Sequence, residues 1–232
     1  MRETIMSTPL SPSKHMSRIQ RTRKQQLGDN FISEVDQALR TLIGITPSRR
    51  QNPSEQMPAG DLSERERKLS GKLMRVNHCG EICAQALYRG QALTSKSATT
   101  RQVMEQAAEE EADHLAWCES RLKELETRKS HLNPAFYAFS FASGMVSGML
   151  GDRINLGFVA ATEEQVVNHL EEHIERLPEK DDRSKSILIK MKADEDHHRT
   201  SALDHGGADF PRPAKKIMTL LSKAMTRSTY WI

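Results

Sequence analysis

Two single glutamates and two Glu-x-x-His sequences constrain this chain more than any other feature. They occur in the order Glu81, Glu111 with His114, Glu163, and Glu195 with His198. The interval from the single glutamate to the pair is 30 residues in the first half (81 to 111) and 32 in the second (163 to 195). Of the nine histidines, only two follow a glutamate by three positions. Residues i and i+3 share a helix face, so each pair directs a carboxylate and an imidazole to one point.

The spacing of these residues predicts two antiparallel helical hairpins. If one helix ends near residue 95 and the next begins near 99, Glu81 and Glu111 both lie roughly 20 Å from the turn. The second half repeats this arrangement around Pro178 and residues 182–184. One Glu from each of two helices, plus Glu-x-x-His from each of two others, is the ligand set of ferritin-like di-iron and di-manganese bundles. The sequence therefore predicts an all-α fold, a ferritin-like four-helix bundle.

The predicted ligands lie on apolar helix faces, which argues against ordinary solvated positions. Glu163, for example, shares its face with Val159, Val166 and Leu170. Buried carboxylates without partners cost several kcal/mol each. Four ionised glutamates carry a charge of −4, which two divalent cations would balance. Oxygen and imidazole donors without thiolates favour iron or manganese over structural zinc. The six candidate metal ligands are Glu81, Glu111, His114, Glu163, Glu195 and His198.

The chain as a whole divides into three predicted parts. Residues 1–30 form a basic flexible arm, and residues 31–60 form a short amphipathic helix (31–43) followed by a linker. Residues 61–232 form the bundle domain, with helices near 63–95, 99–127, 152–177 and 182–205. Ser63 and Glu66 have the spacing of a capping box at the first of these starts. Because the three cysteines are odd in number and residues 1–30 lack the apolar stretch of a secretory signal, we expect a reducing cytoplasm.

Two segments bear on membrane contact. Residues 132–151 carry no formal charge and form the long crossover between the second and third bundle helices. This stretch either packs on the bundle or embeds shallowly in a membrane face. The amphipathic segment 214–232 combines apolar, aromatic and cationic residues, which favours the membrane interface. Gly144-x-x-x-Gly148 indicates close helix contact. The mildly basic pI near 8.8 does not argue for nucleic acid.

A competing metal motif occurs at His169-Leu170-Glu171-Glu172-His173, the H-x-x-E-H pattern of some zinc proteases. Such a short string is weak evidence, and little chain remains for a protease scaffold. We expect His173 to be a surface residue. His169 is expected next to the metal ligands or on the substrate side.

Four strings, "LMRVNHCGEICAQALYRGQAL", "EEEADHLAWCESRLKEL", "LGFVAATEEQVVNHLEEHI" and "MKADEDHHRTSALDHGG", closely resemble the demethoxyubiquinone hydroxylase family. The resemblance spans roughly residues 61–232, and "MTRSTYWI" is similar to the bacterial branch. It implies the same six ligands, with Glu111 and Glu195 as bridging carboxylates. It also favours Glu163 over Glu164, and i+3 geometry favours His198 over His197.

By this resemblance, the chain is expected to be an O₂-dependent di-iron monooxygenase of ubiquinone biosynthesis, with the di-iron centre itself as the catalytic group. The implied substrate is a polyprenylated demethoxyubiquinone or demethoxyubiquinol. An external reductant is needed, with NADH as the candidate. The expected location is peripheral, on the cytoplasmic side of the inner cell membrane, beside other ubiquinone-biosynthesis proteins. The alternatives are a ferritin-type iron-binding bundle and a zinc hydrolase using His169 and His173.

Overall fold

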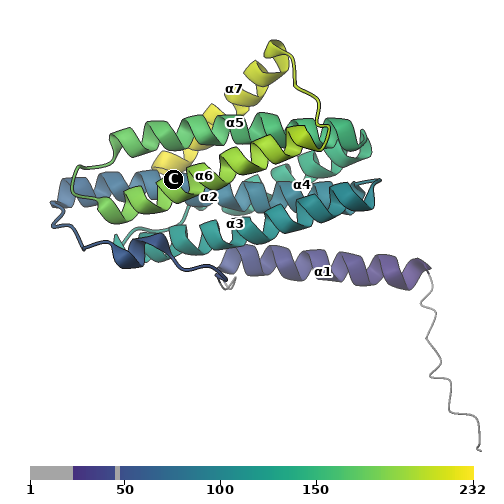
Figure 1. The fold of residues 1–232 in the computed structure, drawn as a ribbon. Helices are drawn as coiled ribbons and strands as arrows, with labels where there is room; N and C mark the ends of the chain where they lie inside the picture. The colour runs from purple at the N-terminus through teal and green to yellow at the C-terminus, as the bar shows by residue number, and fades with distance from the viewer. Residues whose placement is uncertain (1–22, 45–47) are drawn as a thin grey trace, which may run out of the picture.

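Four long antiparallel helices form the body of the molecule (Figure 1). The computed structural model describes residues 23–44 and 48–232. In that part of the chain the bundle helices are α2 (Glu64–Thr94), α3 (Ala98–Glu124), α5 (Asp152–Arg176) and α6 (Asp182–Asp204). The other elements are α1 (Arg23–Ile43), the short 3₁₀ helix η1 (Pro53–Gln56), α4 (Asn133–Met149) and α7 (Arg212–Trp231). The described residues contain no β-strand, which confirms the predicted all-α fold.

Local sequence signals set the boundaries of the bundle helices. Ser63 caps α2, accepting from the backbone N–H of Glu66, while the Glu66 side chain accepts from the Ser63 backbone. The capping box is therefore confirmed. The Asp181 side chain accepts from the backbone N–H of Ser184 at the start of α6. The side chain of Ser97 caps α3 in the same way, accepting from the backbone N–H of Thr99. In each hairpin, the capping residue therefore marks where the turn stops and the second helix begins.

The ligand-bearing positions lie between two apolar clusters. One cluster includes Met74, Trp117, Cys118, Leu170, Leu188 and Met191. The other includes Tyr88, Ala107, Ala108, Val159, Ala160 and Ala202. On every bundle helix the predicted ligands fall, in sequence, between residues of the first cluster and residues of the second. The site is consequently a polar layer enclosed by packed apolar residues at both ends.

The uncharged crossover folds into α4, which packs along α2. Gly144 allows this approach, because a Cβ there would collide with the carbonyl oxygen of Leu87. Likewise, a Cβ on Gly148 would meet the Thr94 hydroxyl, and one on Gly90 would meet the carbonyl oxygen of Phe141. The close contact predicted for the Gly144-x-x-x-Gly148 sequence is confirmed. The opposite face of α4 remains exposed, so packing on the bundle accounts for only one side of this helix.

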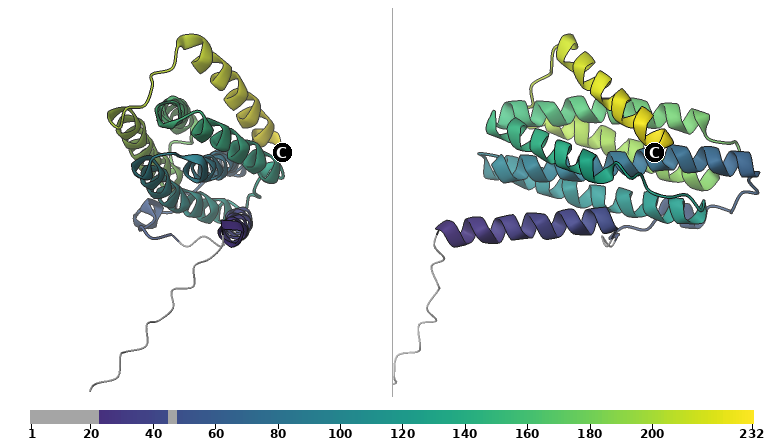
Figure 2. Two further views of the ribbon diagram at one scale, coloured as in Figure 1. Left: turned by 90° about the vertical axis from the view of Figure 1, so that its right-hand side faces the viewer. Right: turned by 180° about the vertical axis from the view of Figure 1, so that it is seen from behind.

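Helices α1 and α7 lie outside the four-helix bundle, at the two ends of the chain. The N-terminal helix begins at Arg23 rather than at residue 31 as predicted. Apolar periodicity starts only at Phe31, but Lys, Gln and Leu favour helix, and extending a formed helix is easier than starting one. Residues 1–22 of the arm predicted over 1–30 lie outside the described residues. The C-terminal helix α7 crosses the bundle obliquely (Figure 2), and Lys72 lies over the Trp231 ring at 4.2 Å from its centroid.

Candidate metal centre

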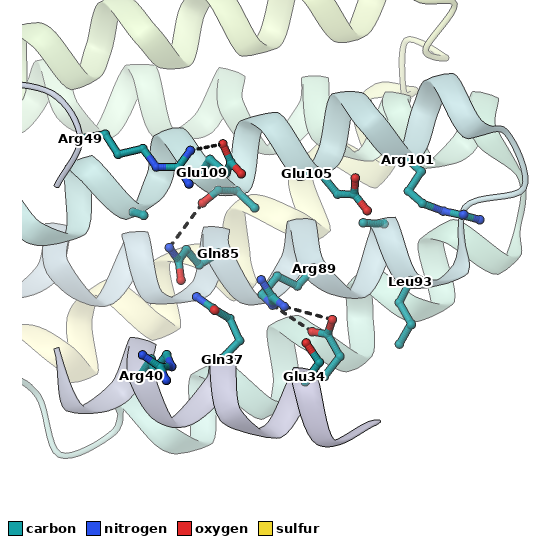
Figure 3. A pocket seen from close by; sticks show the side chains of 14 residues that line it. Glu34, Gln37, Arg40, Arg49, Gln85, Arg89, Leu93, Arg101, Glu105 and Glu109 are labelled. Atoms are coloured by element: carbon teal, nitrogen blue, oxygen red, sulfur yellow. Dashed lines mark hydrogen bonds and ion pairs between the residues drawn. The ribbon is translucent and has the colours of Figure 1, made fainter. Parts of the chain in front are cut away.

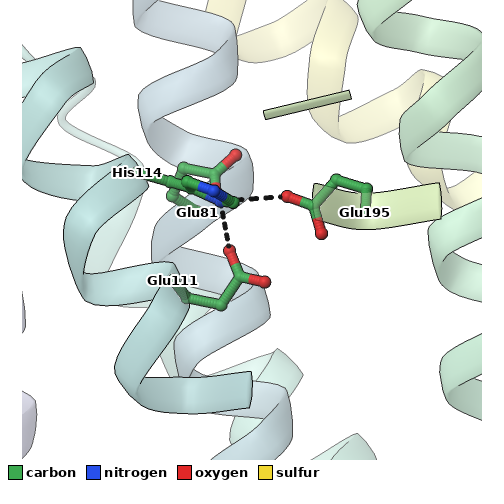
Figure 4. A group of neighbouring side chains, drawn as sticks. All are labelled: Glu81, Glu111, His114 and Glu195. Carbon is green, nitrogen blue, oxygen red and sulfur yellow. Dashed lines mark hydrogen bonds and ion pairs between the residues drawn. The ribbon is translucent and has the colours of Figure 1, made fainter. Parts of the chain in front are cut away.

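All six predicted ligands are buried in the middle of the bundle. Glu81 comes from α2, Glu111 and His114 from α3, Glu163 from α5, and Glu195 and His198 from α6. Their exposed fractions range from 0% for Glu111 and His114 to 8% for His198. Figure 4 shows Glu81, Glu111 and Glu195 converging on the His114 ring from three helices.

Glu111 and Glu195 each contact both imidazoles. Glu111 places Oε2 3.2 Å from His114 Nδ1 and Oε1 3.4 Å from His198 Nδ1. Glu195 places Oε1 3.1 Å from His114 Nδ1 and Oε2 3.1 Å from His198 Nδ1. Both carboxylates therefore span the gap between the two halves of the site. The bridging role that the family resemblance implies for both carboxylates stays a prediction.

The two halves of the site differ in their single glutamates. Glu81 Oε2 lies 3.5 Å from His114 Nδ1, and one donor atom each from Glu81, Glu111, His114 and Glu195 lie within 4.8 Å of one another. Glu163 is outside that group. Its Oε1 instead accepts a 2.6 Å hydrogen bond from the Tyr88 hydroxyl. Tyr88 was not among the residues predicted from sequence.

Burial and mutual contact strongly perturb these groups. Burial, then the charge of Glu111, raises the pKa of Glu81 well above its usual range. Burial, then the charges of Glu195 and Glu111, raises the pKa of Glu163 well above its usual range. Burial alone would also raise the pKa of Glu111, but its close contacts with the His114 and His198 imidazoles outweigh burial and lower that pKa well below normal.

An acidic residue holds the outer nitrogen of each histidine. His114 Nε2 lies 3.0 Å from Asp194 Oδ2, and His198 Nε2 lies 3.0 Å from Glu110 Oε2. Such partners fix which ring nitrogen faces a metal and how the ring is turned. Sequence reasoning missed both. The available signal was an acidic residue immediately before each ligand glutamate, at 110 and 194.

The donor set could hold a metal ion. Within the described part of the chain, the buried Glu81 Oε2 and Glu111 Oε1 make no hydrogen bond. Buried carboxylate oxygens without hydrogen bonds are costly unless a cation satisfies them. Oxygen donors with imidazole, and no thiolate, suit iron or manganese.

The competing histidine pair does not assemble such a group. The His169 and His173 rings are tilted by 56° with centroids 3.9 Å apart, and His173 is 3% exposed rather than at the surface as predicted. Its Nδ1 lies 3.0 Å from Asn77 Oδ1 because that face of α5 packs against α2. Among the described residues, neither histidine belongs to a cluster able to hold a metal ion.

Cavities of different character flank the helices of the site. A narrow, mainly apolar one of about 50 Å³ lies between α2, α5 and α7, and its lining includes Glu81, Glu163, Glu195 and His169. The role of His169 as a neighbour of the ligands stays a prediction. A polar cavity of about 880 Å³ lies between α1, α2 and α3 (Figure 3). Its charges are largely paired within the chain, as Arg89 is with Glu34 at 2.9 Å.

The fold and this layer of carboxylates and imidazoles define an all-helical bundle protein with a candidate two-metal site. The chain belongs to the family of the ubiquinone biosynthesis protein COQ7, whose model matches residues 68–229. This confirms the predicted family and its ferritin-like fold.

Close relatives carry one name. A "3-demethoxyubiquinol 3-hydroxylase" of Chromohalobacter salexigens is 53% identical over 210 residues, covering 90% of this chain and 99% of its own. A protein of the same name from Pseudomonas aeruginosa is 51% identical over 205 residues, covering 88% and 95%. One from Nitrosomonas europaea is 50% identical over 204 residues, covering 88% and 98%.

Proposed function

We propose that this chain hydroxylates the ring of a demethoxyubiquinol-type intermediate with O₂, as a 3-demethoxyubiquinol 3-hydroxylase. The observation that carries the proposal is the buried layer in which Glu111 and Glu195 each contact both His114 and His198. Six buried donors from four helices match the ligand set of di-iron carboxylate bundles. The names of the relatives supply the substrate class.

Two iron ions are the proposed cofactor, held by Glu81, Glu111, His114, Glu163, Glu195 and His198. Bound there, they would supply the activation of O₂ for ring hydroxylation. Asp194 and Glu110 orient the imidazoles through their outer nitrogens. The apolar clusters on both sides of the layer exclude water, which strengthens every charge interaction inside it.

The narrow apolar cavity is the proposed entrance for the quinone ring. It reaches Glu81, Glu163 and Glu195 from the side that α7 covers. Ser222 and Met225 of α7 belong to its lining. A polyprenyl tail that extends from the cavity toward α7 would remain in an apolar environment. This is more favourable than water by about 0.8 kcal/mol per CH₂.

Peripheral membrane contact is the second part of the proposal. Helix α7 exposes Ile217 (63%) and Leu220 (69%), and α4 exposes Val146 (53%) and Met149 (54%). Both helices lie toward the viewer in the right-hand view of Figure 2. Apolar residues on an amphipathic helix that also carries lysines and arginines are typical of membrane-surface binding. No helix in the described residues combines the length and the hydropathy that a membrane span requires.

The proposed location is therefore the cytoplasmic surface of the inner cell membrane, where a polyprenylated substrate resides. We expect Leu220→Glu to weaken flotation with vesicles of phosphatidylethanolamine and phosphatidylglycerol. Ile189→Glu is the matched control, because Ile189 is 57% exposed but lies on α6. Equal flotation of the two variants would refute the membrane assignment of α7.

The proposed source of electrons is external, because the sequence has no G-x-G-x-x-G and no cysteine set for an iron–sulfur cluster. NADH is the first candidate for this external reductant. Other ubiquinone-biosynthesis proteins are the proposed partners. Both proposals follow from family membership.

The main test measures iron content and ring hydroxylation together. We expect two iron ions per chain, and O₂-dependent conversion of a demethoxyubiquinol analogue. Glu111→Gln should lose most of both, since Glu111 touches both histidines. Glu109→Gln should keep both, because Glu109 is an exposed residue paired with Arg49. A reproducible content of one zinc per chain, or iron-loaded protein without hydroxylation, would refute the proposal.

A further inference from the structure

The segment before the first bundle helix is anchored beside the candidate metal centre. Asp113 of α3 accepts from the Ser48 hydroxyl (3.0 Å) and the Arg49 backbone N–H (2.6 Å). The Trp117 indole N–H donates to Ser48 Oγ at 3.2 Å. Residues 48–50 precede the part of the chain that the family model matches, 68–229. They nevertheless lie against the helix that carries two candidate ligands.

Arg50 links the two helices that carry the Glu-x-x-His pairs. Its Nε donates to Asp113 Oδ2 on α3 at 2.7 Å, and its Nη1 donates to Asp194 Oδ2 on α6 at 2.8 Å. A third contact, from Nη2 to the Glu110 backbone oxygen, is 3.4 Å. The guanidinium also lies 5.0 Å from the centroid of the Trp117 ring. A planar fork of donors makes arginine suited to holding two carboxylates in fixed positions.

Arg50 reaches a candidate ligand through one shared atom. Asp194 Oδ2 accepts from Arg50 and also lies 3.0 Å from His114 Nε2. The opposite nitrogen of that ring faces Glu81, Glu111 and Glu195. Fixing Asp194 therefore fixes the orientation of the His114 ring toward the three carboxylates.

The other half of the site has a weaker support. His198 Nε2 contacts Glu110, whose side chain is 29% exposed, compared with 12% for Asp194. The side-chain hydrogen bond that the Glu110 carboxylate receives besides this one comes from Gln106 at 3.3 Å. In addition, Glu163 Oε1 accepts a hydrogen bond from the Tyr88 hydroxyl. The four donors gathered within 4.8 Å of one another include His114 but neither His198 nor Glu163.

We propose that Arg50 is a positioning residue, which preorganises the His114 half of the site through Asp194 so that this half binds its metal ion first and more tightly. This inference rests on the proposed two-metal site. It makes Arg50 part of the metal-binding machinery although this residue lies outside the bundle.

The test is a titration of the full-length, chelator-stripped protein with Co²⁺, followed by the visible absorption of the bound ion and by competition with a chelator. Wild-type protein should bind two equivalents, the first at least about tenfold more tightly. Arg50→Met should weaken the first equivalent by about 10- to 100-fold, the usual effect of removing such a supporting partner. The second equivalent should stay close to its wild-type affinity.

Three further variants separate positioning from general damage. Arg49→Met is the matched control, since the Arg49 side chain pairs with exposed Glu109 and does not contact Asp194. Arg50→Lys should recover part of the lost affinity, because it keeps the charge but not the fork. Asp194→Asn should weaken the same first equivalent, and combining it with Arg50→Met should add little. If Arg50→Met does not fold, Asp194→Asn and Arg50→Lys still test whether the contact between Arg50 and Asp194 supports the first metal ion.

Each outcome is decisive. Equal loss of both equivalents in Arg50→Met, or an effect no larger than that of Arg49→Met, would overturn the positioning role. If the wild-type protein hydroxylates and binds two ions while Arg50→Met behaves identically, only this inference fails. If the wild-type protein does not bind two ions, the proposed function itself fails.

Discussion

Buried His173 should make the stability of this fold sensitive to acid. The ring is 3% exposed, and its Nδ1 contacts Asn77 Oδ1. Burial, followed by the nearby charges of His169 and Arg176, lowers the pKa of His173 from 6.5 to about 2. The folded protein thus keeps this ring neutral, whereas the unfolded chain protonates it below its ordinary pKa.

The sign and size of the effect follow from proton linkage. A group whose pKa is lowered on folding binds more protons in the unfolded state, so stability is lost as the pH falls below the unfolded pKa. Between about pH 8 and about pH 5, an unfolded histidine with a pKa of 6.5 gains nearly one proton while folded His173 gains none. The corresponding loss in free energy of unfolding is about 2 kcal/mol.

Urea unfolding of wild type and His173→Gln at both pH values isolates this contribution. We expect the loss between the two pH values to be about 2 kcal/mol smaller in the variant. Any effect of acid on bound metal is common to both proteins and cancels in the comparison. Asn77→Ala is the control: it removes the hydrogen bond but leaves the buried ring, so its pH dependence should match wild type. A His173→Gln loss within about 0.5 kcal/mol of wild type would refute this reasoning.

Two further substitutions test the helix phase and the packing. Glu163→Gln should lose roughly one metal ion per chain, whereas Glu164→Gln should keep both, because Glu163 is buried and Glu164 pairs with Lys215 at 2.6 Å. Metal analysis decides, and loss of metal in Glu164→Gln alone would contradict the assignment. Gly144→Ala should lower the free energy of unfolding by about 1–3 kcal/mol, since the added Cβ meets the α2 backbone. Gly80→Ala meets nothing within 4 Å and should raise it by up to about 1 kcal/mol. Thermal unfolding curves that shift in the same direction for both would refute the packing argument.

The sequence by itself determined the bundle and the candidate ligands. The helix repeat relates residues three and four positions apart, so Glu111 with His114 and Glu195 with His198 had to share helix faces wherever those helices lay. Caps such as Ser63 are equally local. For the same reason the direction of Glu163 into the bundle, and of Glu164 away from it, was predictable.

Only the tertiary structure decided which side chains support these ligands. Asp194 meets His114, and Arg50 meets Asp194, across 80 and 144 residues of sequence. His173 was predicted at the surface, and it is buried because α5 turns that face toward Asn77 on α2. Such contacts depend on the rotation and offset of one helix against another. Side-chain packing along the whole interface sets that rotation and offset, and no local repeat encodes them.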